Sequence, residues 1–163
     1  MKKKTPLSYY LSLPTKRMGS GVIIRNRQGE ILLLKTTYKD HWEIPGGVVE
    51  KDESPRETAQ RETLEEIDLR IKIKSCLVIH YRAAQGDQNE NIMFVFDGGV
   101  LQNIKKLKID NKEISEAKFV SFKKAELLVG QRIASRLPFC EKALKKKQTI
   151  YLESIKNIKP TEI

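Results

Sequence analysis

Short apolar runs separated by polar turns mark out most of the chain. Residues 22–24 and 31–34 are apolar and flank Asn26-Arg27-Gln28-Gly29, a polar turn that ends in glycine, which predicts a β-hairpin. Further strands are predicted at residues 42–44, at 71–74 leading into 76–79, and at 92–96, 114–120 and 149–152. Residues 1–16 are expected to form an arm with room for one short strand.

Helix signals begin at Ser54-Pro55-Arg56-Glu57, which combines an N-cap serine, a proline in the first turn and the glutamate of a capping box. The helix is expected to run to about Ile67. Residues 122–129 and 131–146 are also expected to be helical, with Pro138 breaking or kinking the second segment. Strands and helices do not alternate regularly, so we expect an α+β fold with a mixed sheet, not a doubly wound one.

The length of 163 residues suits one domain over 1–163, with an N-terminal arm at 1–16 and a basic C-terminal segment at 142–163. No apolar run approaches the roughly 20 residues that a membrane helix needs. The lysine-rich start is not followed by a signal-peptide cleavage site, so a cytoplasmic location is expected. Cys76 and Cys140 are too few for a disulfide framework.

Charge is unevenly distributed along the chain, whose formal net charge is +10. Residues 50–70 hold eight acidic and four basic side chains, so an acidic patch lies on a basic body. Such a patch suits a divalent cation whose anionic ligand is attracted by surrounding lysine and arginine. A basic balance also permits nucleic-acid binding, but no RNA-binding or zinc-finger pattern accompanies it, and the C-terminal lysines suit a solvated face.

Three glutamates on the predicted helix carry the candidate chemistry. Glu62, Glu65 and Glu66 stand at i, i+3 and i+4 and share an arc of roughly 100° beside the apolar face. Like charges at this spacing repel, and no lysine or arginine follows Glu62 or Glu65 by four residues. A hard cation such as Mg²⁺ takes oxygen ligands and would relieve the repulsion. A solvated acidic face accounts for the same three residues, and the pattern alone leaves both readings open.

The residues around these glutamates follow the order Gly47-x5-Glu53-x7-Arg61-Glu62-x2-Glu65-Glu66-x2-Leu69. This order resembles the Nudix box, the signature of the Nudix hydrolase family (MutT-like proteins). The preceding Trp42-Glu43-Ile44-Pro45-Gly46 is also similar to the family's approach to the box, and the resemblance covers about residues 18–122. It implies the Nudix fold, a mixed β-sheet sandwiched between helices (α/β/α).

The resemblance also implies an activity: attack by water on a diphosphate linkage, in a nucleoside diphosphate derivative or a nucleoside triphosphate, with bound Mg²⁺ or Mn²⁺. Glu62, Glu65 and Glu66 would be metal ligands, with the Gly46 carbonyl as a further one.

The box has a structural part as well. Gly47 belongs to it, and Glu53 and Arg61 would form a pair that holds the loop against the helix. A glutamate outside the box serves as general base in some members. Here Glu113 is the better match and Glu116 the second, although Glu113 also suits an ordinary acid at a strand edge.

Substrate contacts are individually weak candidates. Trp42 and Tyr38 could stack on a base or ribose, although a lone tryptophan beside a strand also suits the core. Arg17, Lys35 and Arg82 are candidate phosphate contacts.

Three functions follow from the resemblance. The leading expectation is the pyrophosphohydrolase acting on a small nucleotide, as a monomer or homodimer. The alternatives are a Nudix-like nucleotide-binding module without catalysis and a pyrophosphohydrolase of RNA 5′ ends.

Two positions depart from the family pattern. Asp68 stands where the box has glycine, and Thr63 stands at a position that is usually aliphatic. Aspartate can adopt the left-handed conformation that ends a helix, at a cost of about 1 kcal/mol or less. The Thr63 hydroxyl is expected to bond back to a carbonyl of its own helix. Neither departure removes a candidate ligand.

Overall fold

The structure is a computed structural model that describes residues 6–86, 89–102, 107–109, 112–154 and 160–162. Its strands are β1 (Arg17–Arg25), β2 (Ile31–Thr36), β3 (Trp42–Glu43), β4 (Gly46–Val48), β5 (Cys76–Arg82), β6 (Asn91–Val100), β7 (Ile114–Val120), β8 (Ile150–Ser154) and β9 (Thr161–Glu162). Its helices are α1 (Pro6–Leu11), α2 (Pro55–Ile67), α3 (Phe122–Leu128), α4 (Gln131–Ala134) and α5 (Leu137–Lys146). Within these residues no helix is both long and apolar enough to cross a membrane.

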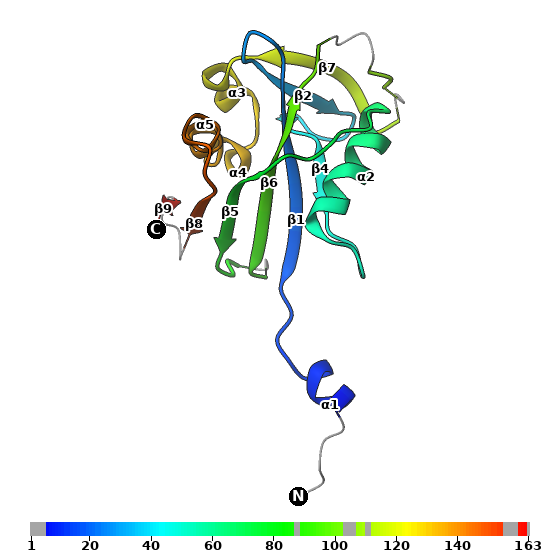
Figure 1. The fold of residues 1–163 in the computed structure, drawn as a ribbon. Helices are drawn as coiled ribbons and strands as arrows, with labels where there is room; N and C mark the ends of the chain where they lie inside the picture. The colour runs from blue at the N-terminus through cyan, green and yellow to red at the C-terminus, as the bar shows by residue number, and fades with distance from the viewer. Residues whose placement is uncertain (1–5, 87–88, 103–106, 110–111, 155–159, 163) are drawn as a thin grey trace, which may run out of the picture.

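The described strands form one mixed sheet in the order β3-β2-β1-β6-β5-β8-β9, with β4 paired to β1 and β7 paired to β2. β1 runs parallel to β6, and β5 runs parallel to β8, whereas β1–β2, β5–β6 and β2–β7 are antiparallel. Helix α2 covers one face of the sheet, and α3, α4 and α5 lie on the other (Figure 1). The expected mixed sheet between helices is therefore confirmed.

Both faces of the sheet are buried, and the strand residues divide between two cores by alternation. Val22 and Ile24 pack with Ala59 and Ile67 of α2, whereas Ile23, which lies between them, packs with the residues of α3 and α5. Strand β2 alternates in the same way over Ile31–Leu34. Period-two alternation in a strand that is apolar on both sides is what a sheet covered on both faces requires.

The predicted hairpin turn is present between β1 and β2. The Asn26 side-chain oxygen accepts hydrogen bonds from the Gln28 and Glu30 amides at 3.0 and 2.9 Å, and Gly29 has φ +82°. The C-terminal helices also follow the prediction, because α4 ends at Ala134 and Pro138 lies in the first turn of α5, where its missing amide costs nothing.

Three predicted elements are wrong. Residues 6–11 of the expected arm form helix α1, away from the body of the protein, whereas residues 1–5 lie outside the described part (Figure 1). Residues 71–74 are not a strand, because Ile73 turns into the core under α2 and the sheet begins only at Cys76. Strand β8 is not the last, because β9 pairs with it at Leu152 and Glu162.

Candidate active site

Helix α2 is fixed at both ends by its own sequence. At its start the Ser54 hydroxyl accepts a hydrogen bond from the Glu57 amide at 3.2 Å, and the Glu57 carboxylate accepts one from the Ser54 amide at 2.8 Å. At its end Asp68 has φ 50° and ψ 38°, and its amide donates to the Leu64 carbonyl at 2.9 Å. The Thr63 hydroxyl donates to the Ala59 carbonyl at 2.6 Å, which satisfies it inside the core. Both departures from the family pattern are thus accommodated locally.

Two glycines allow the β4 loop to approach α2 and β1 closely. Gly46 has φ +147°, and a Cβ there would overlap the Ser20 carbonyl of β1. A Cβ on Gly47 would overlap the carboxylate of Glu62. Only glycine leaves this space, so the Gly46–Gly47 backbone and the edge of α2 meet without an intervening side chain.

The carboxylates of Glu62 and Glu66 both rest on this loop. The Gly46 amide donates a hydrogen bond to Glu66 Oε2 at 3.0 Å. Burial first, and then the negative charges of Glu62, Glu43 and Glu113, raise the pKa of Glu66 to about 8, although the hydrogen bond from Gly46 lowers it. Burial also raises the pKa of Glu62. Several acids therefore compete for ionisation at one place, which is the electrostatic situation that a bound cation relieves.

Arg61 ties the acidic edge of α2 to the loop before the helix. Its guanidinium forms a bidentate pair with Glu53, through Nε and Nη2 at 2.9 and 3.0 Å. Its Nη1 donates to Glu62 at 2.9 Å and to Glu65 at 3.0 Å, and its Nη2 also reaches the Val48 carbonyl at 3.3 Å. Arg61, which precedes Glu65 by four residues, thus relieves the repulsion expected among the glutamates.

The donor set suits a hard cation in its chemistry, although the side chains do not enclose one. In the described residues no three acidic, histidine or cysteine side chains converge tightly enough to surround a metal ion. The reason is visible at Glu65, whose side chain is 58% exposed and is held by Arg61. Glu62 and Glu66 contact the glycine loop, whereas exposed Glu65 contacts Arg61. Carboxylate oxygens of this kind are the ligands that Mg²⁺ prefers.

Glu113 and Glu43 extend the acidic cluster beyond the helix. Glu113 is exposed just before β7, and its carbonyl accepts a hydrogen bond from the Thr37 amide at 2.8 Å. Its charge raises the pKa of Glu66, so the fold brings it near the box. Glu116, the second candidate base, lies opposite Lys35 in the β2–β7 register. Glu43, which the sequence analysis missed, receives two hydrogen bonds from Lys39 Nζ at 2.8 Å.

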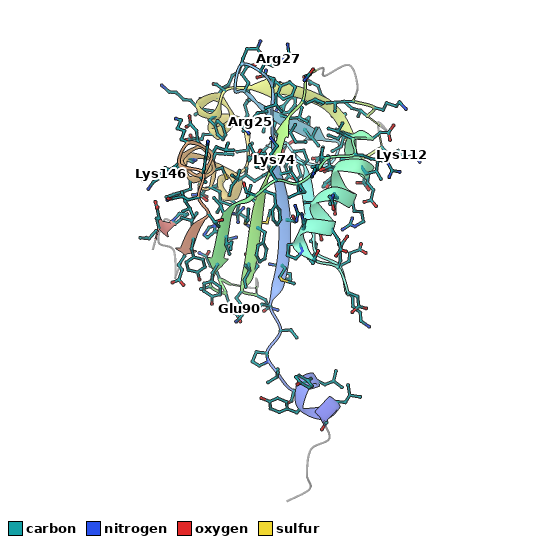
Figure 2. All side chains as sticks on the ribbon, in the orientation of Figure 1. Arg25, Arg27, Lys74, Glu90, Lys112 and Lys146 are labelled. Carbon is teal, nitrogen blue, oxygen red and sulfur yellow. The ribbon has the colours of Figure 1, made fainter. Side chains whose placement is uncertain are left out.

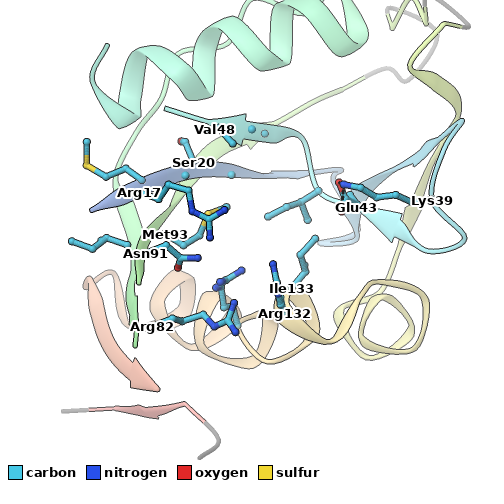
Figure 3. A pocket seen from close by; sticks show the side chains of 18 residues that line it. Arg17, Ser20, Lys39, Glu43, Val48, Arg82, Asn91, Met93, Arg132 and Ile133 are labelled. Atoms are coloured by element: carbon cyan, nitrogen blue, oxygen red, sulfur yellow. Dashed lines mark hydrogen bonds and ion pairs between the residues drawn. The ribbon is translucent and has the colours of Figure 1, made fainter. Parts of the chain in front are cut away.

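A cavity of about 290 Å³ opens from the Gly46–Gly47 loop across β1 and β6 toward α4 (Figure 3). Two of the predicted phosphate contacts, Arg17 and Arg82, line it. The cavity is also lined by polar side chains that the sequence analysis missed, and these are Lys39, Glu43, Asn91, Arg132 and Arg136. They come from loops, strands and helices far apart along the chain, so no local pattern marked them.

The other substrate candidates do not line this cavity. Trp42 is buried in the core shared with α3 and α5, and Lys118 Nζ lies 3.6 Å from the centre of its ring. Tyr38 is 68% exposed, with Lys39 over its ring. Lys35 donates a hydrogen bond to the Lys39 carbonyl at 2.8 Å.

The layered fold and the acidic helix edge beside a basic cavity define a class of protein suited to binding a cation together with an anionic ligand. Residues 15–139 match the sequence model of the NUDIX domain, and the chain belongs to the Nudix family. The match extends at both ends beyond the region in which the sequence motifs showed the resemblance, and it takes in α3, α4 and the start of α5.

Individual relatives share shorter stretches. The chain is 42% identical over 53 residues to an RNA pyrophosphohydrolase of Hahella chejuensis, covering 32% of this chain and 33% of that protein. It is 31% identical over 67 residues to a MutT-like protein of Streptomyces ambofaciens, covering 41% and 43%. The chain thus spans less than half the length of these relatives. The MutT protein of Methanosarcina mazei Go1 has a similar structure, with a TM-score of 0.63 and 26% identity, covering 85% of this chain and all of that one.

Proposed function

We propose that this protein is a divalent-metal-dependent diphosphatase that cleaves the diphosphate linkage of a nucleoside diphosphate derivative or a nucleoside triphosphate. One observation carries the proposal: the loop on which Glu62 and Glu66 rest is also one end of the basic cavity. A nucleotide in the cavity would have its diphosphate linkage beside the carboxylates of α2 and its remaining anionic groups toward the arginine side chains. Family membership and the names of the relatives support the same reaction.

Each residue of the site has its own role in the proposed reaction. Glu62, Glu65 and Glu66, with the Gly46 carbonyl, would hold Mg²⁺ or Mn²⁺. The bound ion would neutralise phosphate charge and lower the pKa of coordinated water.

A water molecule attacks one phosphorus, the bond to the bridging oxygen breaks, and the proton of the water passes to a carboxylate. We assign this base to Glu113, because its charge acts on Glu66 at the centre of the cluster. Arg61 and Glu53 position the helix edge without touching substrate.

The test is hydrolysis of a substrate panel by the purified protein with Mg²⁺, reading released phosphate. The panel contains ADP-ribose, dinucleoside polyphosphates, nucleoside triphosphates, oxidised dGTP and NADH. Glu65→Gln is expected to lower kcat/KM at least about 100-fold, since even the outer partners of metal ligands are worth 10–100-fold. Glu126→Gln is the matched control, because Glu126 is an exposed acid of α3 away from the box.

Three measurements decide the result. Mn²⁺ binding, followed by titration calorimetry, should weaken in Glu65→Gln and persist in Glu126→Gln. Unchanged metal-dependent turnover in Glu65→Gln would refute the ligand assignment. Nucleotide binding without turnover in the unmodified protein would replace the proposal with the non-catalytic module.

The relative from Hahella chejuensis favours a second candidate substrate. Its name describes it as an RNA pyrophosphohydrolase, and a cavity with several arginines suits a chain of phosphates. The same assay with a short 5′-triphosphorylated RNA tests this candidate. Faster turnover of the RNA than of every small nucleotide, with a steep dependence on salt concentration, would favour RNA.

A further inference from the structure

Four arginines meet at the end of the cavity away from α2. Arg17 lies at the start of β1, Arg82 at the end of β5, Arg132 in α4 and Arg136 just before α5. Figure 3 shows Arg17, Arg82 and Arg132 reaching toward the same space from the sheet on one side and the helices on the other. We call this part of the cavity the arginine pocket. Four positive side chains from four elements concentrate charge at one place.

Three of the four arginines have no carboxylate partner among the described residues. In the part of the chain that the structure describes, no acidic side chain lies within ion-pair distance of Arg17, Arg82 or Arg136. Among the described residues, Glu43 is the acid that lines the cavity, and Lys39 donates hydrogen bonds to both of its oxygens.

The arginines also act on one another. Burial and the charges of Arg132 and Arg17 lower the pKa of Arg82. Clustered guanidinium groups without carboxylates repel one another, and an anionic ligand removes that repulsion.

Arg136 is held in place at the back of the pocket. It is 6% exposed, and its Nε donates a hydrogen bond to His80 Nδ1 at 2.9 Å. Because Nδ1 accepts, the proton of the neutral ring sits on Nε2, which lies 2.9 Å from the Ser154 hydroxyl. This partner orients the guanidinium and leaves its charge uncancelled, and the described residues offer no acceptor to its Nη groups. A buried cation fixed in this way is preorganised for an anion.

Two further polar groups line the cavity beside aliphatic and methionine side chains. Ser20 Oγ and Asn91 Oδ1 are buried, line the cavity and find no hydrogen-bond partner among the described residues. Among those same residues no aromatic side chain lines the cavity, so a nucleobase has no ring to stack on. This surface therefore offers a ligand charge, hydrogen bonds and aliphatic contacts, but no ring stacking.

We propose that the arginine pocket binds a phosphate group of the substrate other than the two phosphates of the scissile linkage. This inference rests on the proposed function and names its substrate class: diphosphates in which one substituent carries a further phosphate. The charge balance supports it, since the two charges of a disubstituted diphosphate are already matched by one divalent cation. Arg17, Arg82 and Arg136, which have no acidic partner among the described residues, call for an additional anion beyond that cation.

The experiment measures binding and does not depend on turnover. Inorganic tripolyphosphate is titrated calorimetrically into the metal-free protein with EDTA present. Arg82→Gln and Arg132→Gln should each raise Kd at least about tenfold, because a hydrogen bond to a charged group is worth about 1.5–3 kcal/mol and 1.4 kcal/mol is tenfold. Arg27→Gln is the matched control, since Arg27 is exposed in the β1–β2 turn (Figure 2) and is expected to change Kd less than about twofold.

A second titration separates the further phosphate from the scissile pair. Glu66→Gln, which retains the arginine pocket, is titrated with coenzyme A and with dephospho-coenzyme A, which differ by one phosphate monoester. Tighter binding of coenzyme A by at least about tenfold is expected, and Arg132→Gln in the same background should remove the difference. The thermal unfolding of every variant is recorded to confirm that it is folded.

The outcomes separate the two proposals. Tripolyphosphate that fails to bind, or that binds equally well to Arg82→Gln and Arg132→Gln, overturns the arginine pocket. Equal affinity for the two coenzymes overturns the assignment of a further phosphate. Turnover lost in Glu66→Gln while tripolyphosphate still binds supports both proposals. Binding of tripolyphosphate by a protein that hydrolyses no substrate keeps the arginine pocket and rejects the diphosphatase.

Discussion

His80 makes the stability of this protein dependent on pH between pH 7 and pH 5. The ring is buried between Arg136, which donates to Nδ1, and Ser154 at Nε2. Burial first, and then the charges of Arg136 and Arg82, lower the pKa of His80 to about 3. In the unfolded chain the same ring titrates near 6.5. The folded protein therefore keeps His80 neutral at a pH where the unfolded chain already binds a proton.

The sign and size of the effect follow from this difference. Because the unfolded state binds more protons, the free energy of unfolding falls as the pH drops below about 6.5, and the loss is complete only near the folded pKa. Between pH 7 and pH 5 the folded ring stays neutral, so only the unfolded pKa enters, and the expected loss is about 2 kcal/mol. For a chain of this length, the contribution of His80 taken alone corresponds to a fall in Tm of roughly 4–8 °C. Glu66, whose pKa is raised in the folded protein, acts in the opposite direction over this range, so the effect of His80 is measured as a difference between variants.

The assay compares His80→Gln with the unmodified protein in urea unfolding at pH 7 and pH 5 and constant ionic strength. Glutamine keeps an acceptor for Arg136 and a donor for Ser154 but does not titrate, so its loss of stability should be smaller by about 2 kcal/mol. His41→Gln removes the other histidine, which is partly exposed, and serves as the matched control. An equal loss in His80→Gln and in the unmodified protein would refute the linkage.

Three further predictions concern α2 and its surroundings. Asp68→Gly should raise the free energy of unfolding by about 0.5 kcal/mol and leave turnover unchanged, because glycine adopts the left-handed conformation more easily. The Lys108–Asp68 pair is too exposed to offset this gain, and a lower Tm in calorimetry would contradict the prediction. Gly47→Ala should lower kcat/KM at least about tenfold with little change in Tm, because the new methyl group displaces the flexible end of Glu62. An unchanged kcat/KM in steady-state kinetics would refute this. Dialysis against EDTA should stop hydrolysis, and added Mg²⁺ should restore hydrolysis. The protein should stay folded without metal because both of its cores are apolar, and turnover that survives dialysis would exclude a metal-dependent reaction.

Helix α2 could be predicted almost completely because its signals are local. Ser54, Pro55 and Glu57 lie within one turn and fix where the helix begins, and the helical period then places Glu62 and Glu66 on one edge. The hairpin of β1 and β2 was equally predictable from the residues of its turn. Such elements form from residues that are close in sequence, so their positions can be predicted from a single sequence.

Contacts among the glutamates were harder to predict although they are also local. No basic residue stands four residues after Glu62 or Glu65, and the balancing cation is Arg61, which stands four residues before Glu65 and one before Glu62. Its guanidinium is wide enough to serve these carboxylates and Glu53 at once. The spacing permitted the contact, but only the rotamer of a long side chain determines which of several acids an arginine meets.

The arginine pocket shows why the substrate is harder to predict than the chemistry. The acidic edge comes from one continuous segment, whereas Arg17 and Arg82 meet only because β1 pairs with β6 and β6 pairs with β5. Arg136 joins them because α5 packs against β5. Its Nε donates a hydrogen bond to Nδ1 of His80, which lies in β5. None of these pairings can be read from neighbouring residues. It follows that substitutions in β5, α4 and α5 can change which anion is bound while the carboxylates of α2 keep their positions, so relatives sharing only the box need not share a substrate.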